Sequence, residues 1–188
     1  MDFNKKILIA LLISFIVFSS KKNKLVGTSN LLEIVEKTAG DIEEGFYPQS
    51  FENELKKLGW QKGQDWCAYF VKYYILSKIT DKNKRDILNK YLSGSSQQNY
   101  KNLLMLSDKY SWVKKYSYPI DNSIITWQKI DDQTKGHQGI IIDASNYKTL
   151  EGNSFNKLKG KDGVNILTRK NFEVSKNLKL LNYFFVIQ

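Results

Sequence analysis

The chain contains a single cysteine, Cys67, and a single histidine, His137, among its 188 residues. One cysteine cannot form an intrachain disulfide, so the fold has to rest on an ordinary hydrophobic core. One thiol and one imidazole are also too few for a zinc site built from cysteine and histidine clusters. Cys67 is therefore either a small apolar core residue or a reactive thiol, and His137 is the only imidazole that could serve it.

The composition is that of a globular protein with one core. Hydrophobic residues make up 41% of the chain and charged residues 26%, which excludes a wholly disordered chain, a collagen-like repeat and a multi-span membrane protein. Lysine and arginine number 29 against 19 acidic residues, and the net charge of +10 suits an anionic partner. The lysines are scattered through every segment without a recognised nucleic-acid-binding motif, so we expect no nucleic-acid partner.

The first 24 residues differ from the rest of the chain. Residues 7–20 carry no charge, and lysines lie on both sides of them. This apolar stretch is too short to cross the roughly 30 Å of a bilayer core comfortably as a helix, but it matches the apolar region of a secretory signal peptide. We expect residues 1–24 to be a signal peptide or an N-terminal membrane anchor acting through residues 7–20. Residues 25–188 would then be an exported domain; the alternative is a buried N-terminal helix.

Hydrophobic periodicity divides residues 25–188 into a helical first half and a strand-rich second half. Helical spacing predicts helices at 30–37, 51–58, 66–78, 81–92 and 100–110. After Pro119 the period changes from 3.6 to 2, which predicts strands at 124–129, 138–143, 147–151, 164–169 and 180–187. The predicted fold class is α+β, with N-terminal helices packed on an antiparallel β-sheet.

Cys67 lies at the predicted start of helix 66–78. Asp65 is a favourable N-cap residue, and as the cap it places Cys67 at the second helical position. Free backbone N–H groups and the positive end of the helix dipole stabilise a thiolate at such a position. Taken alone, the segment also fits a buried core cysteine on an apolar helix.

The residues around His137 predict a β-hairpin with its turn at 144–146. In this register Asp143 pairs with Tyr147, and the numbers of paired residues sum to 290. His137 then lies opposite Asn153, and Glu151 lies one diagonal step away on the same face. A two-residue turn would spoil this alignment, so the prediction depends on the register.

The hairpin supplies what a nucleophilic cysteine requires. Imidazole is a base matched to neutral pH, and a polar partner on its second nitrogen fixes the tautomer and the orientation of the ring. Glu151 and Asn153 are both candidates for that partner. Three glycines are expected to leave room near the imidazole for a substrate backbone: Gly136, Gly139 and Gly152. Ordinary strand-end roles for all of these residues are the alternative.

Three segments resemble motifs of the CHAP domain, the cysteine- and histidine-dependent amidohydrolase/peptidase family of the NlpC/P60-like, papain-like group. Segment 66–71, Trp-Cys-Ala-Tyr-Phe-Val, resembles the nucleophile helix of the family. Segment 136–141, Gly-His-Gln-Gly-Ile-Ile, resembles its histidine strand, and segment 150–154, Leu-Glu-Gly-Asn-Ser, resembles the motif that follows. A fourth segment, 119–127, is similar to the strand before the histidine. The resemblance covers residues 30–188.

The resemblance implies a papain-like fold and hydrolysis of amide bonds in bacterial peptidoglycan, with the peptide stem as substrate. Cys67 would be the nucleophile and His137 the base. Glu151 would orient the imidazole, and Asn153 would assist by hydrogen bonding. The candidate substrate-binding side chains are Trp66, Trp127 and Gln138, with Trp60 as a further candidate cleft wall; core packing is the alternative for at least two of the three tryptophans.

The chain departs from the family pattern at two places. Residues 121–123, Asp-Asn-Ser, stand where Gly-Asp is usual, and Gln138 replaces an apolar residue. Some members bind calcium through an acidic loop before the cysteine, but residues 59–65 offer one carboxylate, too few for a calcium site. We expect neither a metal nor a cofactor. A non-catalytic protein that binds the cell wall or another surface on a CHAP-like fold remains the alternative to a peptidoglycan amidase or endopeptidase.

Overall fold

A computed structural model describes residues 49–156 and 161–186, all of which belong to one compact unit. The predicted leader at 1–24 and the predicted helix at 30–37 lie outside these residues. None of the helices in the described ranges is long and apolar enough to span a membrane.

The first part of the described chain is helical. Its helices are α3 (Gln49–Lys57), α4 (Cys67–Lys78), α5 (Lys82–Tyr91) and α6 (Ser96–Lys109). The start of α6 was predicted four residues too late, because Ser95 was assigned to a loop. The Ser95 hydroxyl in fact caps the helix by accepting a hydrogen bond from the Gln98 N–H.

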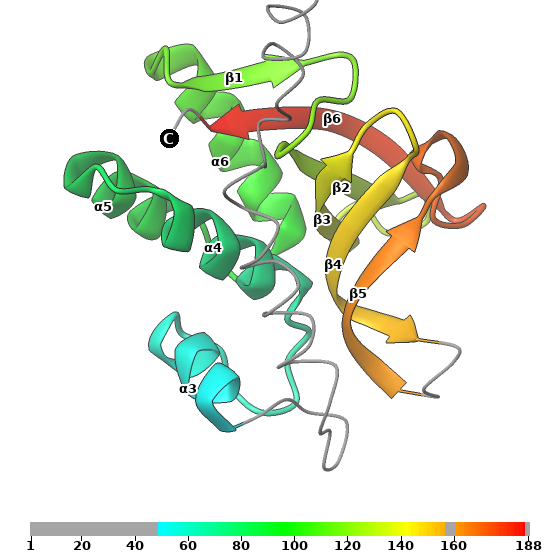
Figure 1. The fold of residues 1–188 in the computed structure, drawn as a ribbon, viewed down its shortest axis with the longest axis horizontal. Helices are drawn as coiled ribbons and strands as arrows, with labels where there is room; N and C mark the ends of the chain where they lie inside the picture. The colour runs from blue at the N-terminus through cyan, green and yellow to red at the C-terminus, as the bar shows by residue number, and fades with distance from the viewer. Residues whose placement is uncertain (1–48, 157–160, 187–188) are drawn as a thin grey trace, which may run out of the picture. The chain divides into compact units, whose positions relative to one another are not determined.

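The second part of the chain forms a six-stranded antiparallel sheet within the described residues (Figure 1). The strands are β1 (Val113–Tyr116), β2 (Ile124–Lys129), β3 (Gly136–Asp143), β4 (Lys148–Asn156), β5 (Lys161–Thr168) and β6 (Leu178–Val186), in the order β1-β6-β2-β3-β4-β5. A short 3-10 turn, η1 (Lys170–Phe172), links β5 to β6. The predicted α+β class with an antiparallel sheet is confirmed. Strand β1 was missed because it is a four-residue edge strand with two exposed lysines at its centre.

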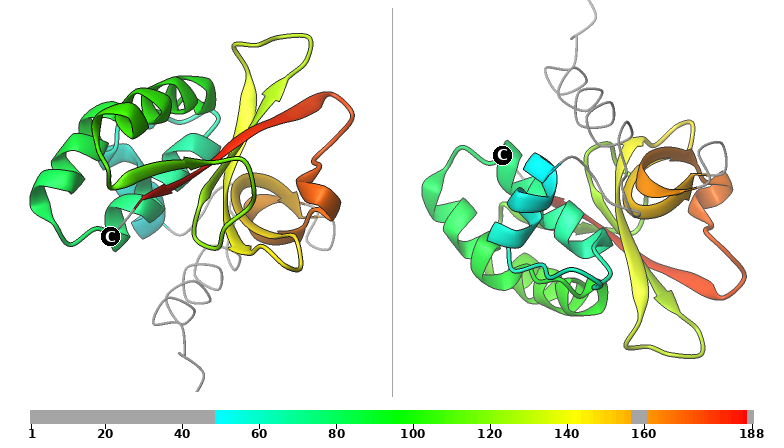
Figure 2. Two further views of the ribbon diagram at one scale, coloured as in Figure 1. Left: turned by 90° about the horizontal axis from the view of Figure 1, so that it is seen from above. Right: turned by 90° about the horizontal axis from the view of Figure 1, so that it is seen from below.

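The sheet buries side chains on both faces. Helices α4 and α6 pack on one face, where Tyr100 of α6 contacts Phe184 of β6 edge to face with ring centroids 5.8 Å apart. Figure 2 shows the helices gathered on one side of the strands. The opposite face carries a second small core, made of Ile125, Trp127, Ile141, Phe172 and Tyr183. A strand such as β2 is therefore buried on both faces, since successive side chains point in opposite directions.

The β3–β4 hairpin has the predicted register away from its turn. Two pairs keep the predicted sum of 290: Ile140 with Leu150 and Ile141 with Thr149. At the turn the prediction was wrong, because Asp143 pairs with Lys148 and Tyr147 lies in the turn with a φ of 55°. A bulge absorbs the extra residue before the strand reaches Glu151. Glu151 is therefore on the predicted face.

Candidate active site

Cys67 is the first residue of α4, with the preceding Trp66 at the N-cap position. The Trp66 ring is buried against the rings of Phe51 and Phe70, with centroids 6.3 and 6.5 Å away. The first hydrogen bond of the helix joins the Phe70 N–H to the Trp66 carbonyl at 2.8 Å. The N–H groups of the first helical residues therefore have no carbonyl acceptor in an earlier turn, and their partial positive charge surrounds the thiol.

The predicted cap at Asp65 was wrong. No side chain caps α4, because Trp66 occupies the N-cap position. The Asp65 carboxylate instead accepts a hydrogen bond of 3.1 Å from Asn153 Nδ2 of strand β4. This contact joins the loop before Cys67 to the strand that carries Glu151.

Gly152 allows α4 to approach β4 closely. A Cβ atom at Gly152 would lie 2.5 Å from both Phe70 Cβ and Trp66 Cζ3, a separation that real Cβ atoms do not adopt. Only glycine therefore fits between the strand and the first turn of the helix. This close packing brings the start of α4, and with it Cys67, to the strands that carry His137 and Glu151.

His137 is the second residue of β3, and Cys67 is close enough to its ring to shift the pKa of the imidazole. Its Nε2 atom lies 2.8 Å from Glu151 Oε2. Nδ1 is therefore the ring nitrogen that Glu151 does not hold. Trp127, which pairs with His137 across β2 and β3, stacks on the ring with centroids 5.7 Å apart and planes 24° apart. The ring is thus held at one edge and on one face.

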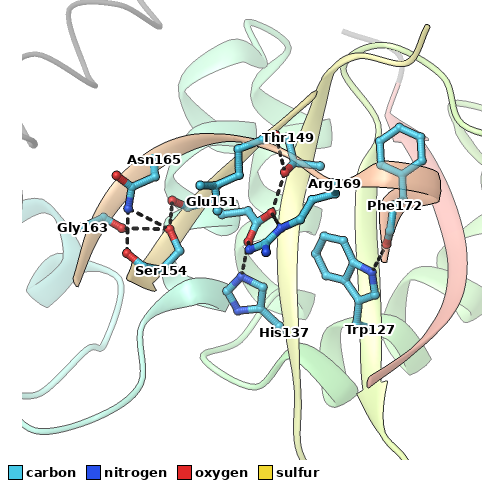
Figure 3. A network of polar contacts seen from close by, with 10 residues as sticks. Trp127, His137, Thr149, Glu151, Ser154, Gly163, Asn165, Arg169 and Phe172 are labelled. Carbon is cyan, nitrogen blue, oxygen red and sulfur yellow. Dashed lines mark hydrogen bonds and ion pairs between the residues drawn. The ribbon is translucent and has the colours of Figure 1, made fainter. Parts of the chain in front are cut away.

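Glu151 is fully buried and its carboxylate is satisfied on both oxygens (Figure 3). Oε1 accepts hydrogen bonds from Thr149 Oγ1 and from Arg169 Nε, the latter at 2.9 Å. Oε2 accepts from His137 Nε2 and from Arg169 Nη2 at 2.7 Å. A Cβ atom at Gly139 would lie 2.8 Å from Glu151 Cγ, so this glycine leaves the space that the glutamate side chain occupies.

These contacts set the protonation states of the pair. Burial alone would raise the pKa of Glu151, but hydrogen bonds from His137 and Arg169 and their charges outweigh it and lower this pKa to about 2. Burial alone would lower the pKa of His137. The interactions of the ring with Cys67 and with Glu151 outweigh this effect and raise the pKa to about 10. At neutral pH Glu151 is therefore ionised and the His137 ring is cationic. The cationic ring and the N-terminus of α4 are the two positively polarised groups beside the Cys67 side chain.

The structure brings together three of the four predicted catalytic residues, Cys67, His137 and Glu151. Asn153 is not opposite His137 as the register predicted. The β4–β5 register shifts between Glu151 and Ser154, and Asn153 adopts a left-handed backbone with a φ of 53°. This irregularity turns its side chain to Asp65, beside the start of α4.

The three side chains predicted to bind substrate, Trp66, Trp127 and Gln138, are buried in the protein. Trp66 is enclosed by aromatic rings, and Trp127 donates from Nε1 to the Phe172 carbonyl at 2.7 Å. Gln138 donates to Thr126 Oγ1 at 2.9 Å on the face that α6 covers. Trp60, the further candidate, is buried as well. Each of these four residues is at most 2% exposed.

The space beside each of the three glycines of the hairpin region is filled by other groups of the protein. The space beside Gly136 is filled by the Trp127 carbonyl and Gln97 Nε2, each closer than 2.5 Å to an added Cβ atom. The spaces beside the other two, Gly139 and Gly152, are filled by Glu151 and by the first turn of α4. The prediction that these glycines leave room for a substrate backbone was therefore wrong.

Sequence reasoning missed Arg169 and Thr149. Thr149 shares a strand face with Glu151, so alternation along β4 could have found it. Arg169 follows β5 directly, and only the pairing of β4 with β5 brings it to Glu151. One signal was present: Arg169 is one of two arginines among 29 basic residues, and a two-point contact with a carboxylate requires the guanidinium group.

In the described part of the chain, no group of three or more histidine, cysteine, aspartate or glutamate side chains could hold a metal ion. Comparison of the chain with models of known protein families, with curated proteins and with solved structures gives no match.

Proposed function

We propose that this protein is a cysteine hydrolase that cleaves amide bonds in the peptide stems of bacterial peptidoglycan. The observation that carries the proposal is that Cys67 lies close enough to His137 to shift the pKa of its ring, while Glu151 holds the other side of that ring through Nε2. The nucleophile begins a helix, the base lies on an adjacent strand, and a buried carboxylate holds the base. This is the arrangement that a papain-like CHAP domain would have, and membership in that family is part of the proposal.

The mechanism begins with the Cys67 thiolate. It attacks the carbonyl carbon of the amide, and the oxyanion that forms accepts hydrogen bonds from N–H groups at the start of α4. His137 donates its Nδ1 proton to the leaving amine as the C–N bond breaks, which leaves a thioester on the cysteine. The neutral His137 then takes a proton from water, and the resulting hydroxide attacks the thioester and releases the acid and the thiolate.

Glu151 keeps the ring of His137 in one orientation throughout these steps. Its hydrogen bond to Nε2 directs the other nitrogen, Nδ1, toward Cys67. Its negative charge stabilises the ring when the ring is protonated, which is the resting state before attack. Glu151 itself is buried and does not touch the substrate in this mechanism.

The substrate class is inferred from the charge and the resemblance. Peptidoglycan stems carry carboxylates, and a chain with a net charge of +10 attracts such a polymer. The proposed location is outside the cytoplasm, in the periplasm, at the cell surface or in the medium. Residues 1–24 are proposed to act as a signal peptide or as an anchor through residues 7–20.

The test is digestion of purified peptidoglycan, with released muropeptides identified by mass spectrometry. We expect Cys67→Ala and His137→Ala each to reduce release to background, because one lacks the nucleophile and the other the base. Cys67→Ser is the matched variant, since it preserves the side-chain shape and lacks the thiolate. Undiminished release by Cys67→Ala or His137→Ala, in protein with the wild-type circular dichroism spectrum, would show that this site is not catalytic.

One observation favours the non-catalytic alternative, a protein that binds the wall without cutting it. The residue Cys67 is only 6% exposed and the His137 side chain only 14% exposed, so access to the thiol is narrow. Iodoacetamide separates the two functions. An enzyme should be alkylated at Cys67 at pH 6 far faster than a free thiol, and a binding protein should not be.

A further inference from the structure

We propose that Arg169 is a positioning residue for His137, and that the turn at 169–172 holds the imidazole by two separate routes. One route runs through the carboxylate of Glu151, and the other runs through the indole of Trp127. The inference rests on the proposed function for its catalytic meaning, but the geometry it describes can be tested without any substrate.

The first route is a two-point contact between Arg169 and Glu151. Nε lies 2.9 Å from Oε1 and Nη2 lies 2.7 Å from Oε2, so the planes of the two groups fix each other. Oε2 is also the oxygen that accepts from His137 Nε2. Rotation of the carboxylate would therefore break its contact with the ring, and the guanidinium prevents that rotation.

Arg169 is itself fixed by its backbone. Its N–H donates to the Tyr147 carbonyl at 2.8 Å, in the turn between β3 and β4. Its own carbonyl accepts a hydrogen bond from the Phe172 N–H. The side chain is 20% exposed, so it also lies mostly inside the protein. A side chain held in this way can transmit a fixed geometry to Glu151.

The second route begins three residues later, at Phe172. The Phe172 carbonyl accepts a hydrogen bond of 2.7 Å from Trp127 Nε1, and the Trp127 ring stacks on His137 (Figure 3). Phe172 is buried in the second small core, on the sheet face opposite the helices. Its ring contacts that of Tyr183 edge to face, with centroids 6.1 Å apart. One short turn therefore supports both the edge and the face of the imidazole.

The backbone of this turn is unusual. Asn171 and Phe172 both have left-handed backbone angles, with φ of 53° and 57°. Such conformations are unfavourable for residues other than glycine, and they persist only where the surrounding contacts enforce them. Here they bring the Arg169 side chain and the Phe172 carbonyl to two neighbours of the same ring. A relaxed extended connection from β5 would not present both groups together.

The chain offers a matched set of variants for the test. Arg169→Gln removes the charge and the two-point contact, whereas Arg169→Lys retains the charge and loses the two-point contact. Lys170→Gln makes the same change of charge one residue later, at an exposed position of the same turn. A positioning role predicts that His137 is held most firmly in wild type and in Lys170→Gln, which should behave alike. It should be held less firmly in Arg169→Lys and least firmly in Arg169→Gln.

The direct measurement is nuclear magnetic resonance of protein labelled with ¹⁵N-histidine, because the chain has one histidine and therefore one pair of ring signals. We expect wild type and Lys170→Gln to show a single ring state with an Nε2 proton protected from exchange. Arg169→Gln should lose that protection by at least about 10-fold and should titrate at a different pH. An Arg169→Gln spectrum and titration identical to those of wild type would overturn the proposal.

Muropeptide release by the same variants gives a second readout. We expect a loss in kcat of about 10- to 100-fold for Arg169→Gln, partial recovery in Arg169→Lys, and little change in KM. If Arg169→Gln cleaves as fast as wild type, the positioning role fails while the proposed function stands. If wild type releases nothing, the proposed function fails, and the histidine spectra alone decide whether Arg169 positions the ring.

Discussion

His137 and Gln138 are neighbours on β3, yet they belong to two polar networks of different kinds. His137 joins a charged network with Glu151 and Arg169, which reaches the start of α4 at Cys67. Gln138 points to the other face, where it accepts a hydrogen bond of 3.1 Å from Asn99 of α6. The network of Gln138 is fully buried and carries no formal charge, and it ties a helix to the sheet.

The comparison shows that the charged network of the candidate active site and the neutral network that holds α6 on the sheet lie on opposite faces of β3. Breaking a neutral network leaves buried amide and hydroxyl groups without partners, which costs stability and does not depend on pH. Breaking the charged network alters which groups hold protons, so its effects depend on pH and reach the proposed reaction. Because successive side chains point to opposite faces, a substitution at one position of β3 should have the first effect and a substitution at the next position the second.

The largest effect should come from Glu151→Gln. The substitution leaves the Arg169 guanidinium without its carboxylate partner and weakens the hold on His137, so we expect a destabilisation of about 3–5 kcal/mol and loss of muropeptide release. Chemical denaturation and the release assay measure the two effects. Glu173→Gln is the matched control, because this glutamate is exposed a few residues beyond Arg169. Equal stability of the two variants would contradict the ion-pair network described above.

The fold was largely readable from the sequence because its strands have clear limits. Strand β2 occupies the predicted residues 124–129, and strands β3 to β6 overlap their predictions. The partnership of Cys67 with His137 was also predictable, since the chain offers no other thiol or imidazole. Glu151 followed from the hairpin register, which survived a wrong turn because a bulge restored it.

Each misplaced residue has its own physical explanation. Strand β2 is buried on both faces, so its hydrophobic pattern does not separate a cleft wall from a core position, and Trp127, for which both roles were considered, packs in the core. Asn153 was misplaced because its left-handed backbone breaks the alternation of β4. Arg169 was missed because its role depends on the pairing of β4 with β5, which local periodicity does not specify.

The pH dependence of stability should show the charged network directly. Glu151 has a lowered pKa, so its contribution is present above pH 4.5 and is lost, by roughly 3 kcal/mol, as pH falls toward 2. His137 has a raised pKa, so its contribution is full below pH 6.5 and is lost as pH rises toward 10. The two together are greatest between pH 4.5 and 6.5.

Urea unfolding of wild type across pH 3–10 measures this profile, and His137→Ala gives the comparison. The variant should lose the alkaline decline that His137 causes and should keep much of the acid decline, because Arg169 still holds Glu151 ionised. A wild-type alkaline limb unchanged in His137→Ala would contradict the raised pKa of the ring.

The smallest effect should come from the neutral network, through Gln138→Leu. The leucine fills a similar volume but leaves Thr126 and Asn99 without their amide partner, so we expect a loss of about 1–3 kcal/mol. Gln98→Leu on the exposed side of α6 is the matched control and should change stability by less than about 0.5 kcal/mol. The pH profile of Gln138→Leu should parallel that of wild type, since no charge is altered. A changed profile would mean that the two networks are coupled through β3, and that adjacent residues on opposite faces of this strand do not act independently.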